Sequence, residues 1–256
     1  MTGLGSGLLL IALNPLPSLA GDAEIERAIR ELFGNARPQT GRITLSLPPL
    51  AESGNSVPLT VSIDSPMTES DHVRRVCILA NRNPRPLIAT MIFGPKSGKA
   101  VFSTNMRLSG TQDVIAMAQM SDGRLWTEQA RVMVTVGACD SLQMRYEEFA
   151  VPNTRVRVPD SAKAGDIIEI RAMIMHPMEN GFRVDTQGTT IPVHIITDFV
   201  CSYDGAEAFR ATLEPGLSAN PYFSFFIRAT RSGAVDFLWR DQDGTITRAS
   251  APLVVT

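Results

Sequence analysis

The stretch Ala130-Arg131-Val132-Met133-Val134-Thr135-Val136 leads directly into Gly137-Ala138-Cys139-Asp140-Ser141. Every second residue of the first segment is small and apolar, and this period of two is typical of a β-strand with one buried face. The pattern predicts the last strand of a β domain. It also places a thiol just beyond the end of that strand, among small residues.

The same alternation recurs upstream of this strand. Pro- and Gly-containing turns, such as Asn83-Pro84-Arg85-Pro86 and Asp122-Gly123, separate the alternating runs. Seven short strands within about 100 residues are typical of an antiparallel sandwich of immunoglobulin type. The predicted strands are 43–47, 57–63, 73–80, 87–93, 99–105, 113–120 and 125–136.

A second strand-rich region follows a segment without sustained alternation. This segment, 141–159, contains Pro152 and Pro159 and is predicted to be a linker. The strands predicted beyond it are 167–175, 191–200, 207–213, 223–229, 235–240 and 245–255. The chain is therefore predicted to be all-β, with two immunoglobulin-like antiparallel β-sandwich domains, 21–140 and 160–256.

The amino-terminal region predicts a signal peptide and one short helix. An apolar run at 8–13 precedes Ser18-Leu19-Ala20, whose small residues suit cleavage before Gly21. The run is too short for a membrane span, which needs about 20 apolar residues. We therefore expect residues 1–20 to direct export to the periplasm. From Asp22, a suitable N-cap, apolar residues follow at helical spacing up to Gly34 and predict the helix.

Composition and motifs argue against several functional classes. The 256 residues carry a net charge of -2 and no clustered Lys/Arg stripe, so the positive surface that holds a phosphate backbone is not expected. The chain has no Gly-rich phosphate loop, zinc-type Cys pair, Gly-x-Ser-x-Gly elbow or His-Glu-x-x-His helix. We therefore expect neither an enzyme nor a cofactor-binding protein, and no nucleic-acid partner.

The three cysteines differ in their surroundings. Cys77 and Cys201 lie in apolar runs, where a thiol usually behaves as a small buried hydrophobe, whereas Cys139 is flanked by small residues. An odd number of cysteines leaves at least one unpaired within the chain. Three alternatives stay open: an ordinary exposed thiol at Cys139, a disulfide between Cys77 and Cys201, and a cysteine hydrolase that recruits His72, His176 or His194.

One further stretch, Met175-His176-Pro177-Met178, contains two thioethers and an imidazole, which are ligands suited to copper. The competing interpretation is a turn with core methionines, because Glu179-Asn180-Gly181 follows directly. His194 is similarly interpreted as a strand residue. We expect no metal site.

An ordered series of motifs in both halves resembles the SoxYZ sulfur carrier family, with SoxY and SoxZ joined head to tail. The SoxY-like motifs are 43–54, 57–59, 83–87 and 134–139, and the SoxZ-like motifs are 176–181, 191–194 and 218–225. In that family the SoxY cysteine lies in a Gly-Gly-Cys-Gly-Gly stretch at a free carboxy terminus. There it carries sulfur intermediates covalently between periplasmic sulfur-oxidation enzymes.

The resemblance implies that Cys139 is the covalent carrier residue and that Gly137, Ala138 and Asp140 flank it on a carrier arm. Glycines in such an arm permit bending, but only Gly137 is retained here, and the chain continues beyond the arm. The Asp140 carboxylate is expected to disfavour the thiolate. Fused relatives are associated with quinoprotein alcohol dehydrogenase systems. The alternative function is therefore a non-covalent accessory module for such a dehydrogenase.

Overall fold

The computed structural model describes residues 22–138, 153–183 and 187–256. The first half of the chain, 22–138, contains α1 (Asp22–Phe33), β1 (Ile43–Ser46), β2 (Leu50–Ser53), β3 (Val57–Ile63), β4 (Val73–Ala80), β5 (Leu87–Phe93), β6 (Ser97–Met106), β7 (Gln112–Met120) and β8 (Leu125–Val136). The second half, 153–256, contains β9 (Thr154–Arg157), β10 (Ser161–Ala162), β11 (Ile167–Ile174), β12 (Ile196–Tyr203), β13 (Ala206–Leu213), β14 (Tyr222–Arg228), β15 (Gly233–Asp241) and β16 (Ile246–Val255).

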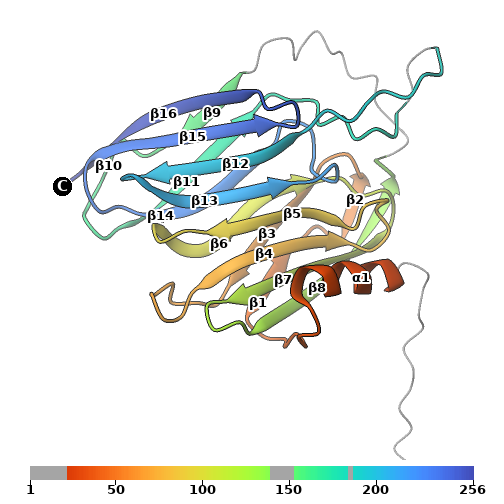
Figure 1. Cartoon of the computed structure of the whole chain (residues 1–256), viewed down its shortest axis with the longest axis horizontal. Coiled ribbons are helices and arrows are strands. Elements are labelled where there is room, and N and C mark those ends of the chain that lie inside the picture. Colours follow the sequence, from red (N-terminus) through yellow and green to blue (C-terminus); the bar gives the residue numbers. More distant parts are fainter. Residues whose placement is uncertain (1–21, 139–152, 184–186) are drawn as a thin grey trace, which may run out of the picture.

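These strands form two layers, and both layers are continuous across the two halves (Figure 1). The six-stranded sheet has the order β1-β3-β6-β14-β11-β9, and the ten-stranded sheet has the order β10-β16-β15-β12-β13-β5-β4-β7-β8-β2. Most neighbouring strands are antiparallel, as the immunoglobulin-like prediction requires. The all-β prediction with one short helix is confirmed.

The halves join edge to edge in both sheets. In the ten-stranded sheet, β13 pairs with β5 and places Phe209 opposite Phe93. In the six-stranded sheet, β14 pairs with β6 and places Phe225 opposite Phe102. Each half therefore satisfies edge-strand hydrogen bonds of the other. The sequence predicts two sandwiches but does not reveal this shared pairing.

One hydrophobic core runs through the junction between the halves. The rings of Phe209 and Phe225 stack with centroids 4.4 Å apart, and Phe93 from the first half meets Phe209 edge-on at 5.7 Å. Within the second half, the ring centroids of Phe199 and Trp239 lie 5.2 Å apart. Aromatic pairs of this kind contribute about 0.5–1.5 kcal/mol beyond their buried area. The aromatic core thus stabilises the joined arrangement.

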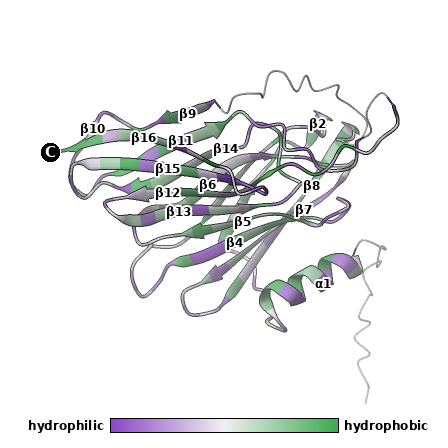
Figure 2. Cartoon of the chain, turned by 45° about the horizontal axis from the view of Figure 1, so that its top comes forward, coloured by the Kyte–Doolittle hydropathy of each residue, from purple (hydrophilic) through white to green (hydrophobic). Residues whose placement is uncertain are grey.

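A smaller core lies under α1, on the outer face of the ten-stranded sheet. Ile25 of the helix packs there with Cys77 of β4 and Met117 of β7. Hydrophobic and hydrophilic residues alternate along α1, as expected for a helix with one packed face (Figure 2). Arg75 fixes the end of the helix, because it donates a 2.6 Å hydrogen bond to the carbonyl of Leu32.

Most predicted strands agree with the structure to within two residues, and four regions differ. One of them is the two-residue strand β10, which is not among the predicted strands. β2 was not predicted, because Pro48 and Pro49 precede a segment without apolar alternation. β9 lies inside the predicted linker, and residues 139–152 of that linker lie outside the described residues. The strand predicted from Ile191 begins at Ile196, because Pro192 has no N–H to donate to a sheet.

The predicted signal peptide, 1–20, also lies outside the described residues. Within the part of the chain that the structure describes, no helix is long and apolar enough to cross a membrane.

Candidate functional site

The chain enters the predicted carrier arm at the end of β8, and backbone hydrogen bonds hold this entry. Gly54 N donates to the carbonyl of Val136 at 2.7 Å, and Leu108 N donates to the carbonyl of Gly54 at 2.8 Å. Ala138 N then donates to the carbonyl of Leu108 at 2.9 Å. The backbone is therefore bound to the protein body up to the residue that precedes Cys139.

Two glycines allow this close approach. A Cβ on Gly137 would lie 2.3 Å from the carbonyl oxygen of Ser109, and a Cβ on Gly54 would lie 2.0 Å from that of Leu108. No side chain fits at such distances. Gly137 does not have the positive φ that specifically favours glycine. Gly137 therefore packs closely against Ser109, and this contact does not depend on a glycine-specific φ.

The loop that receives the arm is held by a buried amide network. Asn83 donates from Nδ2 to the carbonyl of Arg107 at 2.8 Å, and its Oδ1 accepts from Ser109 N at 3.0 Å. Gln112 Nε2 also donates to Asn83 Oδ1, at 2.9 Å. Both amide side chains are buried. Fully paired buried networks are rigid, so the surface beneath Gly137 and Ala138 is well defined.

Arg107 links this loop to the second half. Its Nη1 donates to the carbonyl of Met178 at 2.5 Å and its Nη2 donates to the carbonyl of Pro177 at 3.0 Å. Its backbone N–H donates to the carbonyl of Gly216 at 2.7 Å. The side chain is buried, with 9% of its surface exposed. Hydrogen bonds from a charged donor are stronger than neutral ones, so Arg107 is a principal contact between the halves beside the arm.

The turn that Arg107 binds belongs to the SoxZ-like motif 176–181. His176 N donates to Asn220 Oδ1 at 3.1 Å, and Asn220 N donates back to the carbonyl of His176 at 2.8 Å. Met178 N donates to Nδ1 of His176 at 3.1 Å. Backbone and ring hydrogen bonds of the buried His176 therefore stabilise the turn. Two separate motifs of the second half, 176–181 and 218–225, meet here.

A small pocket of about 30 Å³ lies where the arm leaves the body. Its walls come from both halves: Asn83, Pro84, Arg85, Arg107, Ser109 and Ala138 from the first, and Asn180, Phe182, Pro215 and Gly216 from the second. Arg85 is exposed, and its charge favours ionisation of the nearby Glu214 carboxyl, whose pKa is raised mainly by burial. Phe182 is half exposed. The pocket beside Ala138 thus combines cationic, aromatic and neutral polar side chains.

The structure distinguishes the other two cysteines from this site. Cys77 and Cys201 are both free and fully buried, in β4 and β12. Burial raises the pKa of both thiols, although a hydrogen bond with Thr90 opposes the change at Cys77. The alternative of a disulfide between them is excluded. Cys139 and Asp140 lie outside the described residues, which end at Ala138 on this side.

The candidate metal ligands are explained by packing. Met178 is fully buried and its sulfur accepts the Ile196 N–H at 3.2 Å. The rings of His176 and His194 lie 4.7 Å apart, and burial with the neighbouring His194 lowers the pKa of His176 to about 4. Among the described residues, no group of three or more His, Cys, Asp or Glu side chains is arranged to hold a metal ion.

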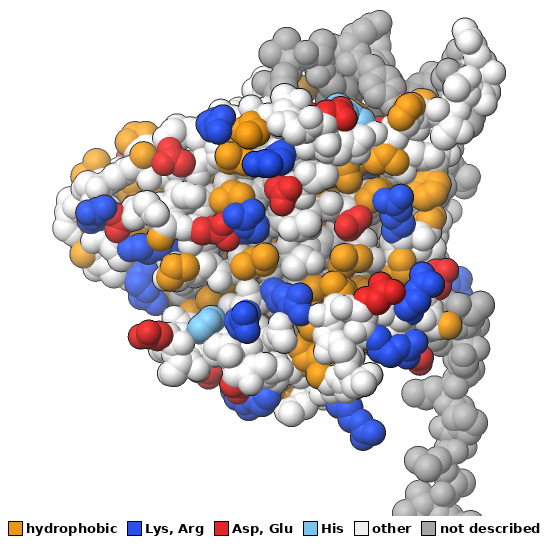
Figure 3. All heavy atoms as spheres, in the orientation of Figure 1, with side chains coloured by type: hydrophobic (Ala, Val, Ile, Leu, Met, Phe, Trp, Pro, Cys, Tyr) orange, Lys and Arg blue, Asp and Glu red, His pale blue; other side chains and the backbone are white. Residues whose placement is uncertain are grey.

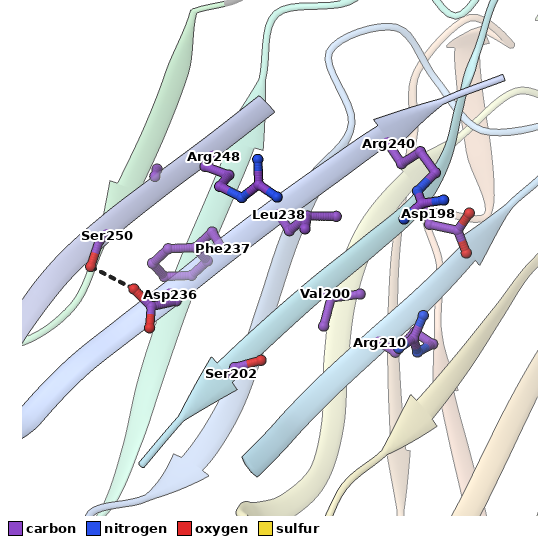
Figure 4. A pocket seen from close by; sticks show the side chains of 11 residues that line it. Asp198, Val200, Ser202, Arg210, Asp236, Phe237, Leu238, Arg240, Arg248 and Ser250 are labelled. Atoms are coloured by element: carbon purple, nitrogen blue, oxygen red, sulfur yellow. Dashed lines mark hydrogen bonds between the residues drawn. The ribbon is translucent and has the colours of Figure 1, made fainter. Parts of the chain in front are cut away.

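A larger hollow of about 870 Å³ lies elsewhere, on the outer face of β12, β13, β15 and β16 (Figure 4). Arg210, Arg240 and Arg248 surround Val200 and Leu238, and the other lining residues are Asp198, Ser202, Asp236, Phe237, Ala249 and Ser250. Acidic and basic side chains are intermixed over this face of the molecule (Figure 3). Ala138 is not among the lining residues, so the hollow is separate from the arm.

The contacts that hold the entry to the predicted arm have no local signal in the sequence. Arg107 follows a predicted strand and carries no local signal, because its partners come from the other half. Asn83 and Gly54 were noted only within family-like motifs. A buried amide and a glycine with no turn role could have suggested close backbone packing, but their partners are more than twenty residues away in the sequence.

Comparison with protein families accounts for both halves. Residues 29–139 match the family model described as sulfur oxidation protein SoxY, and residues 156–252 match the model described as sulphur oxidation protein SoxZ. The two matches follow one another without overlap and together span most of the chain. No curated protein matches the sequence.

Similar solved structures include the sulfur carrier protein SoxY from Chlorobium limicola f thiosulfatophilum, at 24% identity and a TM-score of 0.38, covering 45% of this chain and 99% of that one. A putative superoxide reductase from Thermotoga maritima has 14% identity and a TM-score of 0.34, with coverage of 38% and 93%. With a SoxY domain followed by a SoxZ domain in one polypeptide, the chain belongs to the SoxYZ family of sulfur-oxidation proteins.

Proposed function

We propose that this protein is a periplasmic carrier that holds a sulfur-containing intermediate on the thiol of Cys139 for partner enzymes of thiosulfate oxidation. The two family matches support the carrier role. One structural observation carries the assignment to Cys139: the residue before it, Ala138, lines a pocket built from both halves. A carrier made of SoxY and SoxZ domains would display its thiol at such a junction.

The loading reaction would join the thiol to thiosulfate oxidatively. The Cys139 thiol loses its proton, its sulfur bonds to the terminal sulfur of thiosulfate, and two electrons pass to a haem enzyme. The product is a Cys–S–S–SO₃⁻ adduct. The carrier supplies position, and the catalytic groups belong to the partner. The thiolate is the reacting form, so the Asp140 charge beside it opposes loading by an anion.

Complementation of a deletion strain tests the proposal. We expect wild type and Ser141→Ala to restore thiosulfate oxidation and Cys139→Ser to fail. Intact mass measurement of each protein from the periplasm, with and without reductant, should show a reducible adduct only when Cys139 is present. Asp140→Asn should accelerate loading by tetrathionate, because it removes the neighbouring negative charge.

Full restoration by Cys139→Ser would contradict the covalent carrier. It would favour the accessory module for a quinoprotein alcohol dehydrogenase, in which the thiol is dispensable. Growth on an alcohol substrate of that dehydrogenase would then depend on the protein but not on its thiol.

The periplasmic location is part of the same proposal, and the apolar run at 8–13 with its cleavage-like site supports it. Cell fractionation followed by amino-terminal sequencing should recover a periplasmic protein that begins at Gly21. Recovery of the full-length chain from the cytoplasm would contradict this location.

A further inference from the structure

The reach of the carrier thiol is limited on the side of β8. Ala138 is hydrogen-bonded to Leu108, and Gly137 has no space for even a Cβ. Cys139 follows by one peptide bond, so its Cα lies about 3.8 Å from that of Ala138. A cysteine side chain adds only two bonds. The thiol therefore stays close to the protein body as long as these contacts persist.

A short reach has a consequence for any enzyme that acts on the thiol. Its active site must approach within a side-chain length of Ala138, and its surface must then cover the residues around Ala138. Four of the exposed or half-buried walls of the small pocket carry side chains that project at this surface: Pro84 and Arg85 from the first half, and Asn180 and Phe182 from the second. We call these four residues the arm-base rim.

We propose that the arm-base rim is the docking surface for the enzyme that loads Cys139. This inference rests on the proposed carrier function. Phe182 has 50% of its surface exposed although it is a large aromatic residue. Arg85 beside it is an exposed cation. Aromatic residues and arginine are the types most often found at the energetic centre of protein interfaces.

The rim also indicates the chemistry of its partner. Phe182 favours an apolar contact surface, and the charge of Arg85 favours an acidic group on the partner in addition to the nearby Glu214. The partner is thus an enzyme whose active-site mouth is bordered by an apolar patch and an acidic residue. Because the rim takes two residues from each half, docking would recognise the joined SoxY and SoxZ domains together.

The test uses the full chain in its native host. A deletion strain is complemented with wild type, Phe182→Ser or Arg85→Gln, and the initial rate of Cys139 adduct formation is measured by mass spectrometry after thiosulfate is added to cells. Val254→Ser and Arg248→Gln are matched controls, because Val254 is equally exposed and Arg248 is an exposed arginine in the separate hollow. Each rim variant should load about tenfold more slowly than wild type, and the controls should match wild type.

Loading of the purified proteins by tetrathionate provides the second measurement. The Cys139 thiolate attacks a central sulfur of tetrathionate, the central S–S bond breaks, thiosulfate leaves, and the same Cys–S–S–SO₃⁻ adduct forms. This small reagent needs no docking, so Phe182→Ser and both controls should react at the wild-type rate. Arg85→Gln removes a positive charge from the pocket beside Ala138, so its reaction with this dianion should slow, but by much less than its loading in cells.

The outcomes separate the two proposals. Normal loading of both rim variants in cells would overturn the docking surface while leaving the carrier function intact. Equal slowing with tetrathionate would also overturn it, because the defect would then lie in the thiol itself. A wild-type protein that never carries an adduct in cells, yet reacts with tetrathionate, would overturn the carrier function and the docking surface with it.

Discussion

The guanidinium of Arg107 in the SoxY half donates a 2.5 Å hydrogen bond to the carbonyl oxygen of Met178 in the SoxZ half. Arg107 lies one residue before Leu108, whose carbonyl accepts a hydrogen bond from Ala138 N at the start of the predicted carrier arm. The contact between the halves and the position of the arm therefore depend on adjacent residues of one loop. This relationship leads to the first prediction.

Arg107→Met should destabilise the protein by about 2–3 kcal/mol. The change leaves the carbonyls of Pro177 and Met178 without their charged donor, and hydrogen bonds to charged groups contribute about 1.5–3 kcal/mol. Urea unfolding measures the effect. Arg131→Met is the control, because Arg131 is 56% exposed and its ion pair with Asp113 lies at the surface. A loss no larger than that of the control would contradict the role of Arg107.

Gly137→Ala should destabilise the protein by about 1–3 kcal/mol, the usual effect of forcing extra atoms into a packed site. The added Cβ would lie 2.3 Å from the carbonyl oxygen of Ser109, so the arm would have to move away. Gly110→Ala is the matched control, because nothing lies within 4 Å of its Cβ position. Equal unfolding midpoints for the two variants would show that Gly137 is retained for flexibility instead.

Stability should fall as the pH is lowered from about 6.5 toward 4, in part through His176. Burial and the charge of His194 lower the pKa of His176 to about 4. Across this window the unfolded chain binds a proton that the folded chain excludes, so acid favours unfolding. Urea unfolding at pH 7.5 and 5.0 should show a smaller loss in His176→Asn, which cannot titrate but keeps a hydrogen-bond acceptor for Met178 N. His72→Asn is the control, and a wild-type pH dependence in His176→Asn would contradict this assignment.

Brief alkylation of the native protein should modify Cys139 and spare Cys77 and Cys201. Both buried thiols have raised pKa values and no exposed surface, so they supply little thiolate to the reagent. Peptide mapping after a short exposure to iodoacetamide decides the question, and repetition in urea should label all three. Comparable native rates at Cys77 or Cys201 would show that α1 or the second-half core opens readily.

Raised thiol pKa values also predict how stability changes in alkali. Above the ordinary cysteine pKa, the unfolded chain loses thiol protons that Cys77 and Cys201 keep in the folded state. Unfolding therefore becomes more favourable as the pH rises through and beyond that value. The same urea measurements at pH 8 and 10 should show the decrease, and Cys201→Ala should reduce it.

Most strands could be predicted from the local sequence, because a strand with one buried face alternates apolar and polar residues. β4 and β8 coincide with the predicted ranges of 73–80 and 125–136, which contain an apolar run at 76–80 and an alternating run at 130–136. β2 and β9 are not predicted, because their four residues show no apolar alternation. β1, which is also a four-residue edge strand, is predicted because Ile43 and Leu45 alternate with polar residues. Strands of this kind form by pairing with another strand, and the local sequence does not show which strand that is.

Some residues of the candidate site could likewise be predicted from the local sequence, and others could not. Cys139 and its flanking residues followed from the motif order, because a cysteine among small residues at a strand end is visible locally. Arg107, Asn83 and Phe182 did not, because their roles arise from residues far away in the sequence. Gly137 follows from the motif as a flank of the predicted arm, but its close packing on Ser109 is visible only in the structure.

The sequence by itself determined the β class, the short helix, the two family-like halves and the residue expected to carry the sulfur, because periodicity and motifs are properties of neighbouring residues. Only the tertiary structure decided that both sheets run through both halves and that the backbone is held up to Ala138. Those features depend on which strand edges and carbonyls meet in space. Edge pairing and buried hydrogen bonds join residues that are distant in the chain, so they exist only once the whole chain has folded.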